Sequence, residues 1–325
     1  MSGRSSTWRS TDGRILKALA AAEHAGTLLV PASRTDMDAL RRRCAMGVAI
    51  EPYPRLFART EYWDALCLPA QALHAMRGFQ QQHPVWAFCG PSAAVVHGLS
   101  VSDSLLGTIH VALPKGAHFA ARPGLRLHAI GGRPVVQERG LRVTPVAQTV
   151  LDCACTLDFP SALAMADSAL RLQATSEAEL LQLACEGGRK RRGIVQARRT
   201  LSYADGLAGS ADESIARALM IELGFEVPLL QAEFELPGGR GVARADFAWM
   251  LPDGSLIIGE LEGGREHASE GPSAGWPGVD ALAAERQRAA RMASLRASVV
   301  RFTSDDLKDP QRFSELLESS GVPRA

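Results

Sequence analysis

The sequence lacks several patterns that would assign it at once to a known class of protein. None of its six cysteines lies in a C-x-x-C pair, and no ordered set of cysteines and histidines has zinc-finger spacing. The segment MSGRSSTWRSTDGR has no apolar signal core, and no apolar run approaches the roughly 20 residues that a membrane span needs. We therefore expect buried thiols in a reducing compartment, a cytoplasmic location and no membrane partner.

The chain also has little net charge. A formal charge of +1 over 325 residues neither demands nor excludes a polyanionic partner. The hydrophobic content of 46% and the charged content of 22% are typical of a globular protein, and the length is sufficient for two or three domains. The composition therefore predicts a folded chain rather than a disordered one. We expect the mixed α/β (α+β) class, because the segments described below alternate between helical and strand patterns.

Residues 13–66 have the pattern of helices followed by a short β-ribbon. Apolar residues recur at helical spacing from residue 15 to 25, and Thr35 is the expected cap of a second helix, DMDALRRRCAMG. VAIEPYPRLFARTEYW is typical of two short strands, which predicts a winged helix-turn-helix, although GTLLVPAS between the helices has no helical period. The arginines of this unit are candidate contacts to DNA phosphates, or else a solvated surface: Arg41, Arg42, Arg43, Arg55 and Arg59.

Residues 85–204 alternate between strand-like and helical segments. VWAFCG, TIHVALP and LRLHAI favour strands, and PSAAVVHGL and PVAQTVLDCACTL favour helices, so we expect a middle α/β domain. Its four histidines show no recurring spacing, and packed or surface roles are favoured over catalysis. The basic run RKRRGIVQARR at its end is either a phosphate contact or a solvated helix end.

The chemistry of the third segment, residues 210–319, depends on a tight turn. Two apolar runs flank the tripeptide Pro252-Asp253-Gly254, which supplies the fixed φ and the left-handed residue of an antiparallel hairpin. If these residues form a type I turn with a G1 bulge, Leu251 pairs with Ser255. The same register places Asp246 opposite Glu260.

Acidic side chains then gather on one patch of the hairpin. Glu262 shares the face of Glu260 because side chains alternate along a strand. Like charges about 5 Å apart are destabilising unless a cation neutralises them, and Mg²⁺ prefers a few carboxylates with water and phosphate oxygens. The alternative is an edge hairpin whose acids extend into water. On the preceding helix Ser210 and Glu213 form a capping box, which gives Glu213 a structural role as well.

The order helix, three strands, helix, strand, with these acids in place, resembles the PD-(D/E)XK endonuclease superfamily, and within it the very-short-patch-repair endonuclease-like domains. The resemblance implies a restriction-endonuclease-like α/β domain that hydrolyses phosphodiesters with Mg²⁺. The ligands that it implies are Asp246 and Glu260, with Glu262 as a third ligand or a water-orienting acid, Glu213 hydrating or orienting the ion, and Arg288 steadying the phosphate. The matching residues are Glu213-Ser214, Arg217, Gln231, Asp246-Phe247, Glu260-Leu261-Glu262-Gly263, Glu285, Arg288 and Val300-Arg301-Phe302-Thr303.

The chain departs from that pattern at two positions. Members commonly carry Lys two residues after the catalytic Glu, where this chain has Glu262, and Glu266 replaces the Lys that often follows in the narrower group. The cation that orients the attacking water is therefore absent from its usual place. Arg265 or Arg288 could replace it electrostatically but not as a base, because Arg does not lose its proton.

The first two segments resemble antitoxins of the AbiE type, from type IV toxin-antitoxin systems. GPSAAVVHGL, TIHVALP, LRLHA and GLRVTPVAQTVLDCA carry the resemblance, although Gln148 stands where an Arg often precedes the Thr. The resemblance implies DNA and a cognate toxin protein as partners. The leading hypothesis is thus a DNA-binding protein with a Mg²⁺-dependent endonuclease-like C-terminal domain. The alternatives are a non-catalytic DNA-binding regulator of antitoxin type and a module that neutralises a toxin without touching DNA.

Overall fold

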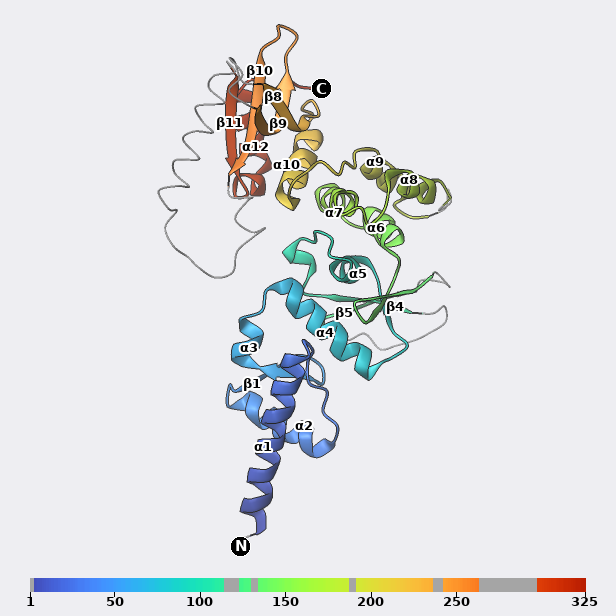
Figure 1. Cartoon of the computed structure of the whole chain (residues 1–325), viewed down its shortest axis with the longest axis vertical. Helices are drawn as coiled ribbons and strands as arrows, with labels where there is room; N and C mark the ends of the chain where they lie inside the picture. The colour runs from blue at the N-terminus through green and yellow to red at the C-terminus, as the bar shows by residue number, and fades with distance from the viewer. Residues whose placement is uncertain (1–2, 114–122, 130–133, 187–190, 236–241, 263–296) are drawn as a thin grey trace, which may run out of the picture. The chain divides into compact units, whose positions relative to one another are not determined.

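The chain forms two compact units, Met1–Cys153 and Ala154–Ala325. The computed structural model describes residues 3–113, 123–129, 134–186, 191–235, 242–262 and 297–325, with the side chains of residues 3–12 left aside (Figure 1). These residues form a mixed α/β fold with three sheets, which confirms the predicted class. The division at 13–66, 85–204 and 210–319 stays a prediction, because compactness alone does not define a module boundary.

The first unit begins with two helices and a β-ribbon, in the predicted order. The elements are α1 Gly3–His24, α2 Arg34–Ala45, β1 Ala49–Tyr53 and β2 Leu56–Arg59, and β1 and β2 pair antiparallel. Residues 25–33 form turns and one antiparallel bridge between Leu29 and Phe57, not a helix. The predicted cap at Thr35 is wrong: Ser33 has the extended backbone of an N-cap, and its hydroxyl accepts the Asp36 N–H at 3.1 Å.

The rest of the first unit is a small sheet with helices packed on it. The remaining elements are α3 Thr60–Asp64, α4 Leu68–Gln82, β3 Ala87–Phe88, α5 Gly90–Val96, β4 Ile109–Leu113, β5 Leu125–Ala129, β6 Val136–Glu138, β7 Leu141–Val143 and α6 Val146–Ala154. The five strands form a sheet with the order β5-β4-β3-β7-β6.

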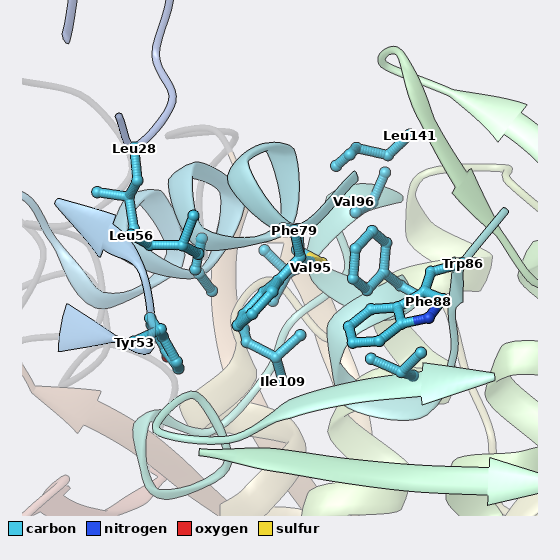
Figure 2. Packing of buried hydrophobic residues seen from close by; sticks show 14 of the residues in the cluster. Leu28, Tyr53, Leu56, Phe79, Trp86, Phe88, Val95, Val96, Ile109 and Leu141 are labelled. Carbon is cyan, nitrogen blue, oxygen red and sulfur yellow. The ribbon is translucent and has the colours of Figure 1, made fainter. Parts of the chain in front are cut away.

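One apolar core runs through this unit from the β-ribbon to the sheet. Tyr53 and Leu56 of the ribbon, Phe79 of α4 and Ile109 of β4 belong to a single buried cluster (Figure 2). The ring of Phe79 lies edge-on to Tyr53, with ring centroids 5.5 Å apart. The ribbon and the sheet therefore share one hydrophobic core, and residues 13–66 belong to the same compact unit as the residues that follow them.

The second unit begins with helices, continues into a four-stranded sheet and closes with one more helix. Its elements are α7 Phe159–Arg171, α8 Glu177–Glu186, α9 Ile194–Ser202, α10 Ala211–Glu222, β8 Leu229–Glu235, β9 Val242–Met250, β10 Leu256–Glu262, β11 Ser298–Thr303 and α12 Pro310–Ser319. The strand order is β11-β10-β9-β8, antiparallel except for the parallel pair β10 and β11 (Figure 1). Its main core is aromatic, with Phe225, Phe247, Trp249, Phe302 and Phe313 all buried.

The prediction of buried thiols is correct for only some of the cysteines. All six are reduced thiols, and Cys89, Cys153 and Cys155 are buried. Cys67 and Cys185 are exposed, so the prediction is wrong for these two. Within the described part of the chain, none of the helices is both long enough and apolar enough to cross a membrane.

Candidate functional site

The predicted turn forms and sets the register of the hairpin. Gly254 has φ +80° and its N–H donates to the Leu251 carbonyl at 2.9 Å, while the Leu251 N–H donates to the Ser255 carbonyl at 2.8 Å. The strands then pair from Leu256 with Met250 to Gly259 with Phe247. The three-residue loop and the Leu251–Ser255 pair are therefore confirmed.

This register brings the predicted aspartate and glutamate to neighbouring strands. Extended by one residue beyond Gly259, it places Glu260 opposite Asp246. Both residues are buried, at 3% and 7% exposure, and Oδ2 of Asp246 accepts the N–H of Leu261 at 3.2 Å. The alternative of acids extending into water is therefore excluded for these two side chains.

Arg301 of β11 contacts both glutamates of β10. Its Nε lies 3.1 Å from Oε2 of Glu260 and 3.7 Å from Oε1 of Glu262. One guanidinium reaching both side chains agrees with their predicted common face. Glu262 differs from Glu260 in burial, because its side chain is 52% exposed. The two glutamates therefore have different environments on the same side of the strand.

Glu213 approaches the same region from the first turn of α10. Ser210 caps this helix by accepting the Glu213 N–H at 3.1 Å, as predicted, but the carboxylate reaches back to the Gly209 N–H, at 2.7 Å, and to the Ser210 hydroxyl. Burial raises the pKa of Glu213, and the negative charge of Asp246 raises it further, against the lowering effect of its hydrogen bonds. The carboxylate of Asp246 therefore lies close enough to oppose the ionisation of Glu213.

Gln231 links Glu213 to the surface of the sheet. It stands between the paired residues Leu230–Phe247 and Ala232–Ala245, and therefore opposite Asp246. Its Nε2 donates to Oε2 of Glu213 at 2.6 Å, and its Oε1 accepts from Arg244. Its backbone has φ +50°, a left-handed conformation that costs about 1–2 kcal/mol for a residue with a side chain. Such strain inside a strand is typical of positions that orient a functional side chain.

Gln231, Arg244 and Arg301 therefore lie around the acids, although the sequence alone gave none of the three a role in the site. Gln231 and Arg301 were part of the family resemblance, yet their partners depend on which strands are neighbours. Arg244 had no sequence signal other than its position two residues before Asp246. Arg288 lies outside the described residues.

The donor types suit a hard divalent cation, because carboxylate and amide oxygens are the ligands that Mg²⁺ prefers. Across the described ranges, however, no three histidine, cysteine, aspartate or glutamate side chains converge closely enough to hold a metal ion. Each of the three buried acids has hydrogen-bond partners within the protein. Glu213 is engaged by Gly209 and Gln231, Asp246 by the backbone of β10, and Glu260 by Arg301.

The arginines of the first unit have unequal surroundings. Arg41 and Arg42 expose their side chains on α2, and Arg55 is exposed in the turn between β1 and β2, with φ +63°. Arg59 forms a bidentate ion pair with the buried Glu23. Arg43 is only 6% exposed and donates to the Ala39 carbonyl at 2.9 Å, so its guanidinium does not reach the surface where a phosphate would bind.

Comparison with known proteins gives relatives without a stated activity. No family model matches the chain. Uncharacterized protein Rv2248 of Mycobacterium tuberculosis strain H37Rv is 34% identical over 243 residues, which cover 74% of this chain and 83% of the relative. Uncharacterized protein MT2308 of strain CDC 1551 matches to the same extent.

Proposed function

The chain belongs to the same family as these two mycobacterial proteins, and we propose that its second unit is a divalent-metal-dependent phosphodiesterase acting on DNA. The observation that carries the proposal is the burial of three acids on adjoining elements. Glu213 of α10, Asp246 of β9 and Glu260 of β10 are exposed by only 7%, 7% and 3%. A fold bears the cost of such desolvation where the charges have a function or a cation to meet.

The proposed roles follow from the positions of the acids. Asp246 and Glu260 would hold the ion, Glu262 would be a third ligand or would orient water, and Glu213 would orient the ion from the helix. Arg288, outside the described residues, keeps its proposed role at the phosphate. A bound Mg²⁺ supplies charge stabilisation at a phosphodiester and lowers the pKa of water. Glu213 in turn is held in place by Gln231 and the Gly209 N–H.

Cleavage of DNA tests this proposal. Purified full-length chain is incubated with supercoiled plasmid and with mismatched duplex, in Mg²⁺, in Mn²⁺ and in chelator. Metal-dependent cleavage is expected, and Asp246→Asn or Glu260→Gln should lower its rate at least about 100-fold, because a catalytic metal contributes several kcal/mol. Asp305→Asn is the matched control, because this carboxylate is exposed and pairs with its near neighbour Lys308. Cleavage that survives Asp246→Asn, or no cleavage in either metal, contradicts the proposal.

A second candidate function is a non-catalytic DNA-binding regulator. It is favoured by a specific observation: Glu260 already has a protein cation, Arg301, at 3.1 Å. The exposed Arg41 and Arg42 on α2 would contact phosphates. Replacing both by Ala should weaken binding of duplex DNA and reduce the slope of log K against log salt by roughly 1–2. Arg312→Ala, in the second unit, is the control, and an unchanged slope in the double variant contradicts this function.

A further inference from the structure

Strands β10 and β11 lie side by side in the sheet (Figure 1), and their parallel pairing makes Glu260 and Arg301 neighbours. The pairing runs from Ile257 with Ser298 to Glu262 with Thr303 and sets Glu260 directly beside Arg301. The Nε of Arg301 is 3.1 Å from Oε2 of Glu260. The cation is therefore placed by backbone pairing and not only by the rotamer of a flexible side chain.

The two partners differ in their exposure to water. The side chain of Glu260 is 4% exposed, whereas that of Arg301 is 42% exposed. A buried carboxylate requires a cation or several donors, but a half-exposed guanidinium can exchange its partner for water at small cost. The pair is thus asymmetric, since Arg301 can leave Glu260 more easily than Glu260 can remain without a cation.

A divalent ion at Glu260 would place two positive groups at one carboxylate. The Nε of Arg301 already occupies Oε2 at 3.1 Å, so an ion that took this oxygen as a ligand would have to replace the guanidinium or lie beside it against the repulsion of like charges. The ion and the guanidinium would therefore compete for the same carboxylate.

We propose that Arg301 is the resident counter-ion of Glu260 and that it regulates metal entry by competing with the ion. The proposal rests on the metal-dependent function proposed above. With no ion bound, Arg301 neutralises the buried carboxylate and maintains the local fold. When an ion binds, the guanidinium moves towards solvent, where the exposed Glu262 remains within its reach. The apparent affinity of the chain for the metal is then lower than the affinity that the acids would have without Arg301. The two affinities differ by the equilibrium constant for the ion pair between Arg301 and Glu260.

Calorimetric titration of the full-length chain with Mn²⁺ at low ionic strength tests this competition. Mn²⁺ is the probe because it favours the same carboxylate ligands as Mg²⁺. Arg301→Gln or Arg301→Met removes the competing guanidinium and should tighten Mn²⁺ binding about 5- to 30-fold. This factor corresponds to an ion pair that contributes about 1–2 kcal/mol. Arg301→Lys keeps the charge and should stay close to the unmodified chain. Arg312→Gln, which removes the ion pair with Asp306, is the matched control and should bind as the unmodified chain does.

The outcomes separate this inference from the proposed function. If Glu260→Gln abolishes Mn²⁺ binding but neither Arg301→Gln nor Arg301→Met tightens it, the counter-ion role is wrong and the metal site stands. If no variant binds Mn²⁺, both are wrong. The melting temperature of each variant shows that it is folded, and the Met variant, which keeps an apolar stem against the sheet, serves if the Gln variant does not fold.

Discussion

Arg217 of α10 donates from one nitrogen to both carboxylate oxygens of Asp167 of α7, at 3.0 and 2.8 Å, with both side chains buried. The pair joins the helical part of the second unit to the helix that carries Glu213. Replacing one partner leaves the other charge buried and uncompensated, so Asp167→Ala should lower the free energy of unfolding by about 3–5 kcal/mol.

Urea unfolding of the full-length chain measures this loss. Asp305→Ala, which removes an exposed pair with Lys308, should cost at most about 1 kcal/mol. The double replacement Asp167→Leu with Arg217→Met should recover most of the loss, because no unpaired charge remains. Equal costs for Asp167→Ala and Asp305→Ala would show that the buried pair is not a significant link.

Gly193 is required at the start of α9 for two reasons. Its φ is +79°, and a Cβ at this position would lie 2.0 Å from the Cys155 carbonyl oxygen. Gly193→Ala should therefore cost roughly 2–5 kcal/mol, about 1–2 for the left-handed backbone and about 1–3 for the steric overlap. Gly47 also has positive φ, +73°, but nothing lies within 4 Å of its Cβ position. Gly47→Ala should show the backbone cost alone, and a similar cost for both variants would argue against the close approach.

His110 should make the first unit sensitive to acid. Burial lowers the pKa of His110 to about 4, with smaller contributions from the charges of His128 and Arg126. The unfolded chain binds this proton at a pKa near 6.5, so the stability present above pH 6.5 is lost as the pH falls towards 4. The loss reaches about 3 kcal/mol. Unfolding measured between pH 4.5 and 7.5 should lose most of this slope in His110→Leu and keep it in the control His24→Gln.

Loss of the hydrogen bond between Gln231 and Glu213 should cost more stability than loss of an exposed hydrogen bond, because the carboxylate of Glu213 is buried. Gln231→Leu removes the 2.6 Å donor and leaves the buried carboxylate of Glu213 with one partner fewer, at a cost of about 1–3 kcal/mol. Gln311 makes a similar side-chain bond to Glu315, at 3.3 Å, on the exposed surface of α12. Gln311→Leu should change the free energy of unfolding by at most about 0.5 kcal/mol. The two values would be similar if Glu213 were held without Gln231.

The hairpin was predictable because its determinants are local. Pro252, Asp253 and Gly254 fix the turn, and the turn fixes the register that brings Asp246 opposite Glu260. The partner of Glu260 was not predictable, since Arg301 lies 41 residues away and reaches it only through the order of the strands. Arg43 shows a second limit. Three consecutive arginines on a helix must face different directions, but only the packing of α2 decides which one is buried.

The anomalous scattering of Mn²⁺ in a crystal of the chain tests the proposal that Asp246 and Glu260 hold a divalent ion. We expect a manganese peak bonded to carboxylate oxygens of both residues, with the guanidinium of Arg301 withdrawn from Glu260. A crystal in which Mn²⁺ is absent from these carboxylates at saturating concentration, with Arg301 still paired to Glu260, would contradict it.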